Sequence, residues 1–540
     1  MQKNETLLLR ADNLGAEMEG VCRHEGVPVF VPGLLPDEEA QVRIVKVEKR
    51  YAFGKMLGLP SSPSLDRVQP DCAVYPQCGG CTSRHMTYDS SLRAKRQHVQ
   101  DCMQRIGHLA VDVPPVLGMA APFAYRNKTA LPAAGDISHP MLGFFAPRSH
   151  RLVPAVSCPN AMPPAPSVAQ AVQDWMTRYR IPPYHEETRT GLIRHLVVRV
   201  NRKQEAMVTL VCRDKTVPHL SELLSAILPL GVISVYLNFN PGNTNVIFGK
   251  SFRLLYGRET LPDTLCGLQF ELSPASFFQV NPLQTEILYE TALNFADLRP
   301  EDSLLDVYCG AGTISLMMAR HCKTVTGIEI VPDAVCNARE NARRNGIQNA
   351  SFVEGKAEIL LPEMIKQGSR PDVIVVDPPR KGLEPAVIEA IAKAAPDRLV
   401  YISCNPATQA RDAALLKEQG YLIQKIQPVD MFPYTSHVET VVQLSKGNIS
   451  TQNVRVEFSL EDMDMSGFQQ GATYEQIQEW IQEKYGFHVT HLNIAKTKQK
   501  CGIIERQNYN LPKSENSRSP DTPKEKEEAI IDAFLHFKMM

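Results

Sequence analysis

Cys404 is the residue whose position most favours chemistry. It follows the apolar run 399–402, which predicts a strand, and Asn405 and Pro406 come directly after it. Ligands of open α/β sheets bind at the carboxyl ends of the strands, so a thiol there can act as a nucleophile. The chain has 13 cysteines, and a free cysteine is more often buried than catalytic. The interpretation therefore depends on the residues that accompany Cys404.

Two carboxylates complete a set suited to covalent chemistry on a nucleobase. Asp377 closes an earlier apolar run and precedes two prolines, and Glu439 stands beside the β-branched run 440–442. Carbon 5 of uracil becomes nucleophilic when a thiolate adds to carbon 6. After methyl transfer, a base must remove the proton from carbon 5 so that the thiolate can leave. Cys404 and Glu439 can fill these roles if both lie at the carboxyl ends of neighbouring strands.

A glycine-rich turn indicates how a methyl donor is held. The turn Cys309-Gly310-Ala311-Gly312 follows a strand pattern and precedes a helical pattern at 314–320. Glycines let a ligand approach the backbone closely, and Glu329 ends the next strand pattern, where ribose hydroxyls need an acceptor. Nicotinamide cofactors use a similar device. The turn is not a full G-x-G-x-x-G, however, and Asp-Pro-Pro follows it in the chain, so the pattern favours S-adenosylmethionine.

A separate cysteine cluster lies nearer the N-terminus. Cys72, Cys78 and Cys81 form C-x5-C-x2-C in a glycine-rich loop, and Cys158 can supply a fourth ligand. Disulfides are not expected in a reducing compartment, so these thiols indicate a metal site. Four thiolates suit either zinc or an iron–sulfur cluster, and spacing alone does not decide between them.

The elements that must position these residues predict a multidomain α/β protein. A chain of 540 residues is too long for one core and implies three or four domains. We expect an N-terminal small β-barrel with strands at 27–31 and 42–47, then an α+β domain with an antiparallel sheet. A Rossmann-like methyltransferase sheet follows, and then a small α+β tail. The expected boundaries are 1–60, 61–272, 273–447 and 448–540.

The tail has local patterns but no catalytic constellation. Residues 473–476 resemble a capping box that opens a helix, with Ile477, Trp480 and Ile481 on one face. We predict a strand at 489–495 and a polar linker at 514–523 before a final helix.

Charge and hydropathy limit the classes of partner. The net charge is −1, yet residues 84–213 hold seventeen Lys and Arg against eight Asp and Glu, which suits contact with phosphates. The barrel adds cations and rings for single-stranded nucleic acid. These residues are Lys46, Lys49, Arg50, Tyr51 and Phe53. No apolar run reaches the length of a membrane-spanning helix, and we expect a cytoplasmic monomer with no membrane partner.

The motifs together resemble the RNA uracil-5-methyltransferase family over residues 1–446. In chain order they are Phe277-Phe278-Gln279-Val280-Asn281, Asp306-Val307-Tyr308-Cys309-Gly310-Ala311-Gly312, Asp377-Pro378-Pro379-Arg380-Lys381-Gly382, Ser403-Cys404-Asn405-Pro406 and His437-Val438-Glu439. The resemblance implies that the barrel is a TRAM module.

The resemblance also implies roles for single residues. Cys404 matches the family's nucleophile and Glu439 its base. The residues that match positions for the methyl donor and the uracil are Gln279, Tyr308, Glu329 and Asp377, with Gly310 and Gly312 in the donor turn. Family members with this cysteine arrangement carry a [4Fe-4S] cluster, so Cys72, Cys78, Cys81 and Cys158 are expected to hold one, with zinc as the alternative.

The leading expectation is methylation of carbon 5 of a uridine in 23S ribosomal RNA. The same reaction on transfer RNA is the alternative substrate. A methyltransferase directed at a base amine would use Asp377 but leave Cys404 and Glu439 without a role. An RNA-binding or assembly protein with secondary methyltransferase activity is the alternative from another class.

Overall fold

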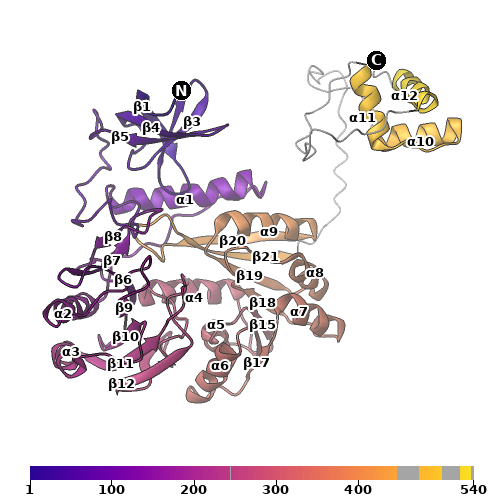
Figure 1. Ribbon diagram of the computed structural model, residues 1–540. Coiled ribbons are helices and arrows are strands. Elements are labelled where there is room, and N and C mark those ends of the chain that lie inside the picture. The colour runs from indigo at the N-terminus through magenta and orange to yellow at the C-terminus, as the bar shows by residue number, and fades with distance from the viewer. Residues whose placement is uncertain (244, 447–473, 502–522, 537–540) are drawn as a thin grey trace. The chain divides into compact units, whose positions relative to one another are not determined.

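The computed structural model describes residues 1–243, 245–446, 474–501 and 523–536 (Figure 1). The chain divides into two compact units, Met1–Ile449 and Ser450–Met540. The first unit contains a small barrel and two seven-stranded sheets. Within the described ranges, no helix is both long enough and apolar enough to cross a membrane.

The N-terminal residues form the expected closed barrel. Its strands are β1 (Thr6–Leu14), β2 (Gly20–His24), β3 (Val27–Val31), β4 (Glu39–Val47) and β5 (Ala52–Met56), in the order β1-β2-β3-β5-β4. The predicted strand at 27–31 is β3, and the run 42–47 lies within β4. Alternate residues of β4, including Val42 and Ile44, face the barrel core. A Cβ on Gly54 would lie 2.3 Å from Val42 Cγ1, so the absence of a side chain there lets β5 close against β4.

The central part of the first unit holds a mixed sheet. Its strands are β6 (Lys128–Gly135), β7 (Pro140–Phe145), β8 (Leu152–Pro154), β9 (Ile193–Val200), β10 (Ala206–Cys212), β11 (Val232–Phe239) and β12 (Ser251–Gly257), in the order β12-β11-β10-β9-β6-β7-β8. The helices are α2 (Ala165–Arg178) and α3 (Leu220–Ile227), with a short 3-10 turn η1 (Leu228–Leu230). Every strand pair is antiparallel as expected except β10 and β11, which are parallel. A parallel pair needs a crossover, and α3 lies in that connection.

The third sheet is the expected Rossmann-like sheet. Its strands are β15 (Ser303–Val307), β16 (Thr324–Glu329), β17 (Ala350–Glu354), β18 (Val373–Val376), β19 (Arg398–Ser403), β20 (Tyr421–Val429) and β21 (Glu439–Lys446), in the order β17-β16-β15-β18-β19-β21-β20. The strands β15 to β19 are parallel, whereas β21 lies between β19 and β20 and runs antiparallel to both. The last strand of the described residues, β21, therefore lies in the interior of the sheet beside β19.

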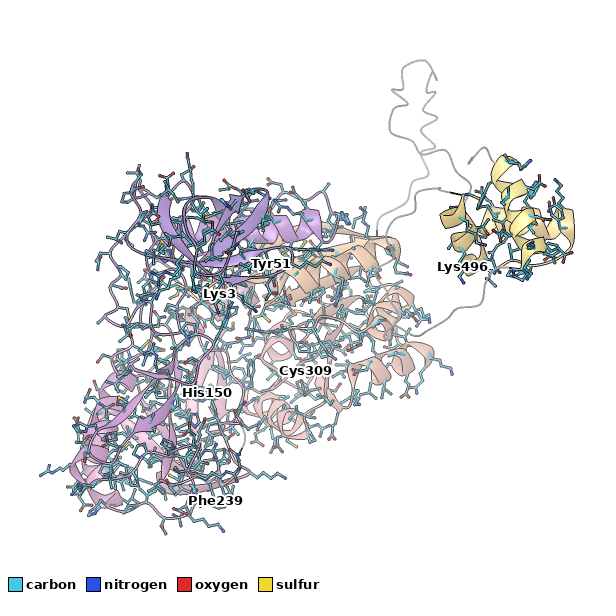
Figure 2. The ribbon with its side chains drawn as sticks, turned by 45° about the horizontal axis from the view of Figure 1, so that its top comes forward. Lys3, Tyr51, His150, Phe239, Cys309 and Lys496 are labelled. Carbon is cyan, nitrogen blue, oxygen red and sulfur yellow. The ribbon has the colours of Figure 1, made fainter. Side chains whose placement is uncertain are left out.

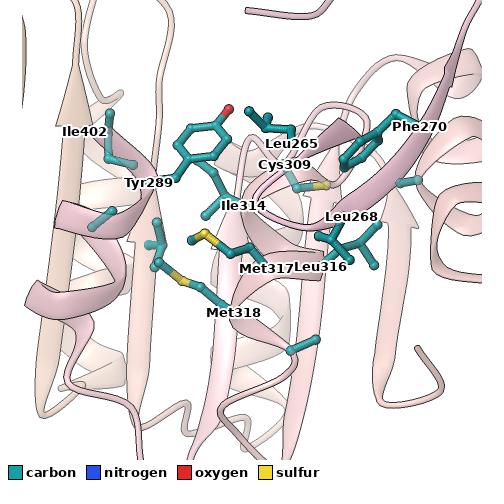
Figure 3. Close-up of a cluster of buried hydrophobic side chains, with 14 of the residues drawn as sticks. Leu265, Leu268, Phe270, Tyr289, Cys309, Ile314, Leu316, Met317, Met318 and Ile402 are labelled. Atoms are coloured by element: carbon teal, nitrogen blue, oxygen red, sulfur yellow. The ribbon is translucent and has the colours of Figure 1, made fainter. Parts of the chain in front are cut away.

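Helices cover both faces of this sheet. They are α4 (Pro282–Ala296), α5 (Thr313–Met318), α6 (Pro332–Arg344), α7 (Ala357–Lys366), α8 (Pro385–Ala394) and α9 (Pro406–Glu418). On one face, α4 to α6 pack with the hairpin β13 (Leu261–Leu265) and β14 (Leu268–Leu272), and Figure 3 shows part of that core. Cys309 lies among these apolar side chains, 6% exposed (Figures 2 and 3). Its thiol is therefore part of the core beneath the donor turn.

Helix α1 (Tyr88–Arg105) joins the core on the other face. It precedes the central sheet in the chain, yet its buried residues Val99 and Met103 share a core with α7, α8 and α9. Figure 1 shows α1 running beside α9. The cysteine-bearing segment before α1 is thereby brought to the methyltransferase sheet.

The described residues of the second unit are helical. They form α10 (Tyr474–Tyr485), α11 (His491–Lys500) and α12 (Lys524–His536), around a core that includes Ile477, Ile481 and Phe534. The helix after residue 473 and the final helix are confirmed. The strand predicted at 489–495 is wrong, because Ile494 faces this core from α11. Thr473 of the predicted capping box and the linker residues 514–522 lie outside the described residues.

Candidate active site

The sheet brings Cys404 and Glu439 to the same edge. Cys404 directly follows the last residue of β19, and Glu439 is the first residue of β21. These strands are antiparallel, and Ser403 of β19 pairs with Thr440 of β21. One position farther toward this edge, the chain reaches Cys404 after β19 and Glu439 at the start of β21. The two residues do lie on neighbouring strands, but the expectation that both lie at carboxyl ends is wrong for Glu439, because β21 runs antiparallel to β19 and begins at this edge.

The segment around Cys404 is fixed by local hydrogen bonds. The N–H of Asn405 donates to Ser403 Oγ at 3.1 Å, and Asn405 Oδ1 accepts from the N–H of Ala407 at 3.1 Å. Asn405 is thus the N-cap of α9, and Pro406 opens the helix. The strand-to-helix turn leaves Cys404 half-buried.

Burial and charge act together on Cys404 and Glu439. Glu439 is 6% exposed, and burial with the negative charge of Asp377 raises its pKa to about 8. Burial also raises the pKa of the Cys404 thiol, with smaller contributions from Glu439 and Asp377. The positive charge of Arg380 opposes both shifts. These four side chains therefore share one electrostatic environment.

Asp377 connects this group to the donor turn. It follows β18, and its N–H donates to the carbonyl of Val307 in β15 at 3.4 Å. Burial, with a further contribution from the charge of Asp306, raises the pKa of Asp377 to about 7. Asp377 thus stands between the strand that precedes the donor turn and the strand that precedes Cys404.

The donor turn and Glu329 are in direct contact. The N–H of Gly310 donates to Glu329 Oε2 at 3.0 Å, and the N–H of Val331 donates to Oε1 at 2.8 Å. The turn is left-handed at Tyr308, with φ of 73°, and at Gly312, with φ of 79°. A Cβ on Gly312 would lie 3.0 Å from Ala338 Cβ, so the position requires glycine.

Two residues of the site were not singled out from the sequence. Asp306 is fully buried, and Ser315 Oγ donates to its Oδ2 at 2.5 Å, while Oδ1 has no hydrogen-bond partner among the described residues. Burial raises the pKa of Asp306 to about 6. Arg380 stands in a quoted motif but received no role. Asp306 and Arg380 could have been found from the sequence, because each lies in a motif at the end of a predicted strand.

Gln279 lies in the segment between β14 and α4. It precedes α4, whose N-cap Asn281 accepts from the N–H of Gln284 at 3.2 Å. The carbonyl of Gln279 accepts from Asn127 Nδ2 at 3.0 Å, which ties it to the central part of the unit. Among the described residues, no hydrogen bond joins its side chain to the donor turn.

The four predicted cysteine ligands line one cavity. Cys72, Cys78, Cys81 and Cys158 border a space of about 380 Å³. Burial raises the pKa of Cys78, and the charges of the other three thiols contribute in the same direction. In the described ranges, no three His, Cys, Asp or Glu side chains converge closely enough to hold a single metal ion.

Comparisons with known proteins agree with this architecture. The family model described as tRNA (Uracil-5-)-methyltransferase matches residues 251–447, and the TRAM domain model matches residues 2–57. The second match corresponds to the barrel.

Relatives match along nearly their whole length. An uncharacterized RNA methyltransferase from Clostridium tetani is 42% identical over 448 residues, covering 82% of this chain and 97% of the relative. One from Halalkalibacterium halodurans is 42% identical over 453 residues, covering 83% and 98%. The solved tRNA (uracil-54, C5)-methyltransferase of Pyrococcus abyssi, in complex with S-adenosyl-L-homocysteine, has a TM-score of 0.66 and 27% identity, covering 81% of this chain and 99% of that one. The chain belongs to the family of S-adenosylmethionine-dependent RNA (uracil-5-)-methyltransferases.

Proposed function

We propose that this enzyme methylates carbon 5 of a specific uridine in 23S ribosomal RNA, with Cys404 as nucleophile and Glu439 as base. The observation that supports these roles most directly is the placement of Cys404 and Glu439 at one sheet edge, beside Asp377. An amine-directed methyltransferase would need no thiol there. The charge of Asp377 raises the pKa of both Cys404 and Glu439, which supports a role for the three side chains in one reaction.

The reaction uses Cys404 twice. Its thiolate forms a bond to carbon 6, and the electron pair of the C5–C6 double bond moves into an enolate. The methyl donor, when bound, supplies an electrophilic methyl carbon for carbon 5. Glu439 then accepts the proton of carbon 5, the double bond reforms, and the C6–S bond breaks to return the thiolate.

The charges at the site suit this sequence of steps. Arg380 counters the rise in the pKa of Cys404, so it favours the thiolate that attacks. Burial holds the pKa of Glu439 at about 8, which makes its carboxylate a stronger base than one in water. A bound sulfonium cation would favour ionisation of both carboxyl groups.

The methyl donor is proposed to lie along the carboxyl ends of β15, β16 and β18. The backbone of Gly310 and Gly312 would give it room, and Glu329, which accepts from the N–H of Gly310, would also accept from ribose hydroxyls. Tyr308 and Asp377 would border the methyl-bearing end. Gln279, from the loop before α4, would close the site above the uracil.

RNA contact is proposed for an aromatic face of the barrel. The rings of Phe30, Tyr51 and Phe53 lie 5.6 to 5.8 Å apart between centroids, and Tyr51 is 39% exposed (Figure 2). Arg148, from the turn between β7 and β8, has its guanidinium 5.4 Å from the centroid of Phe53. Rings and a cation together suit single-stranded bases and phosphates. Lys46, Lys49 and Arg50 are the proposed cations for phosphate contact, and Lys46 is also paired with Glu48 at 2.6 Å.

We propose that the four-cysteine cavity holds an iron–sulfur cluster. The four thiols line a cavity of about 380 Å³, which is more room than one tetrahedral zinc ion takes. Cys72, Cys78, Cys81 and Cys158 would hold a [4Fe-4S] cluster in a structural role, because methyl transfer to uracil needs no electron transfer. Anaerobic purification should yield a brown, iron-containing protein. A colourless protein with stoichiometric zinc would replace the cluster with the alternative metal.

Transfer RNA is the second candidate substrate. It is favoured by the similarity to the Pyrococcus abyssi enzyme, whose description names uracil-54 of transfer RNA. In either case we propose a monomer that acts in the cytoplasm.

One experiment separates these substrates. Cells lacking the protein are complemented with the wild type or with Cys404→Ala, and 5-methyluridine is mapped across 23S ribosomal RNA and transfer RNA. We expect one or more ribosomal sites to lose methylation without the protein, and only the wild type to restore them. If only transfer RNA lost 5-methyluridine, transfer RNA would be the substrate. If neither RNA lost it, the proposed function would be overturned.

A further inference from the structure

The loop that leads into Glu439 is held from outside its own sheet. Residues 430–438, between β20 and β21, are called the base loop here. Its first residue, Asp430, is fully buried and accepts from Lys95 Nζ at 2.5 Å and from the hydroxyl of Tyr88 at 2.6 Å. Lys95 donates also to the carbonyl of Phe432 at 3.0 Å. Both donors belong to α1, so α1 fixes the start of the base loop.

The middle of the base loop is bound to the cysteine-bearing segment. The carbonyl of Tyr434 accepts from the N–H of Thr82 at 2.9 Å and of Ser83 at 3.2 Å, and these two residues directly follow Cys81. The backbone of Tyr434 is left-handed, with φ of 62°, which a bulky side chain rarely adopts. Such a conformation persists only where its surroundings determine it, and the two hydrogen bonds supply that constraint.

A single buried cation links the base loop to both cysteine-bearing segments. The guanidinium of Arg84 lies 4.3 Å from the centroid of the Tyr434 ring, and its side chain is 1% exposed. Arg84 also forms an ion pair with Asp71 and donates to Asn160 Oδ1. A desolvated cation–π contact is stronger than an exposed one.

The partners of Arg84 adjoin the thiols. Asp71 precedes Cys72, and Asn160 lies two residues after Cys158. Asn160 Nδ2 donates to Cys81 Sγ at 3.4 Å. Arg84 therefore contacts both the base loop and residues that adjoin the thiols.

Two further contacts complete the attachment. The hydroxyl of Tyr125 donates to the carbonyl of Pro433 at 3.1 Å, and Ser436 Oγ donates to Glu17 in the barrel at 3.0 Å. The base loop is thus held by α1, the cysteine segment, the central part of the unit and the barrel. Cys404 and Asp377, by contrast, are delivered by β19 and β18 and depend on none of these contacts.

We propose that Arg84 and Tyr434 are positioning residues, which transmit the geometry of the four-cysteine site to Glu439 and thereby set the rate of the last step. In that step the proton of carbon 5 passes to the Glu439 carboxylate, the C5–C6 double bond reforms and the C6–S bond to Cys404 breaks. The inference rests on the proposed roles of Cys404 and Glu439. A displaced base loop slows proton removal and leaves attack and methyl transfer intact.

The test compares Tyr434→Leu with the matched variant Tyr434→Phe, which keeps the ring over Arg84. Single-turnover reactions with RNA and S-adenosylmethionine are quenched, and covalent adduct and released methylated RNA are resolved on a denaturing gel. We expect Tyr434→Leu to prolong the life of the methylated adduct by about tenfold or more, because small misplacements of a catalytic group are costly. Adduct formation should change less than about twofold, and Tyr434→Phe and the surface control Glu389→Gln should match the wild type.

Amide hydrogen exchange without RNA or methyl donor gives a second readout. Peptides from the base loop should exchange faster in Tyr434→Leu and in Cys81→Ser, while α8 exchanges as in the wild type. Unchanged exchange in Cys81→Ser overturns the inference even if Tyr434→Leu fails to fold. Equal slowing of adduct formation and release in Tyr434→Leu also overturns it.

A reference variant separates this inference from the proposed function. Glu439→Gln should trap the methylated adduct. If it traps the adduct but Tyr434→Leu does not prolong its life, only the positioning role fails. If Glu439→Gln traps nothing, the assignment of the base fails and the positioning role fails with it.

Discussion

Asp377 and Glu439 lie close enough for the charge of the first to raise the pKa of the second. Burial is the larger cause, and together the two effects bring the pKa of Glu439 to about 8. The carboxyl group of Glu439 is therefore mostly protonated at neutral pH before the methyl donor binds. A group proposed to accept a proton must first lose one, and this requirement gives the enzyme a defined pH dependence.

Release of methylated RNA should become faster as the pH rises toward about 8. The ionised fraction of Glu439 grows over that range, and the Cys404 thiolate, whose pKa is also raised by burial, grows with it. The rate of adduct breakdown, measured by rapid quench at a series of pH values, separates the base from the nucleophile. A breakdown rate independent of pH between about 6 and 8 would contradict the role of Glu439.

The same shift predicts how stability depends on pH. The pKa of Glu439 is raised in the folded state above its ordinary value of 4.5, so the folded protein keeps a proton that the unfolded chain loses. Stability should therefore fall as the pH rises from about 4.5 toward about 8.

Glu439→Gln isolates this contribution, because glutamine keeps the size and removes the charge. We expect the variant to melt at a higher temperature than the wild type at about pH 8 and to approach it near pH 5. Glu389 is an exposed carboxylate on α8, and Glu389→Gln is the control. This variant should melt at the same temperature as the wild type at both pH values. Equal pH profiles for wild type and Glu439→Gln would be inconsistent with a proton held at this site.

Substitution of the nucleophile should abolish covalent chemistry. Cys404→Ala is expected to form no covalent adduct and to methylate RNA at least about a thousandfold more slowly, while still binding RNA. Cys336, on α6, is exposed, and Cys336→Ala should behave as the wild type. Methylation is measured by the incorporation of labelled methyl groups into RNA. If Cys404→Ala retained this activity, the assignment of Cys404 as nucleophile would be excluded.

Two glycines test the donor turn. Gly312 and Gly346 both have left-handed backbones, with φ of 79° and 66°, but only at Gly312 would a Cβ meet neighbours, at 3.0 Å from Ala338 and Phe352. Alanine at either position costs about 1–2 kcal/mol of backbone strain. Gly312→Ala should additionally weaken binding of S-adenosylmethionine by at least about tenfold in calorimetry, because the turn must shift. Equal affinities for the two variants would argue against this placement of the donor.

Local patterns predicted the elements that carry the site. Strand ends at Cys404 and Glu329, the glycine turn and the barrel strands each follow from a few neighbouring residues, and the structure has them. Patterns of this range do not encode the sheet order, so the insertion of β21 between β19 and β20 could not be foreseen. The parallel pairing of β10 and β11 could not be predicted for the same reason.

Contacts between residues that are distant in sequence could not be predicted either. Lys95 and Asp430 are 335 positions apart and Arg84 meets Tyr434 through space, so neither pairing has a signal in composition or spacing. The strand predicted at 489–495 failed for the opposite reason. Its β-branched residues favour a strand locally, but packing in the three-helix core decides the outcome.

The pairing register of the antiparallel strands β19 and β21 decides which side chain lies beside Cys404 as the proposed base. Successive side chains of a strand point to opposite faces, so a slip of one residue in β21 would withdraw Glu439 from its place beside Cys404 and present Val438 or Thr440 instead. Neither of those side chains can accept a proton from carbon 5. A shift of one residue between β21 and β19 would thus stop the proposed reaction at its final step and leave the strand that carries Cys404 in place.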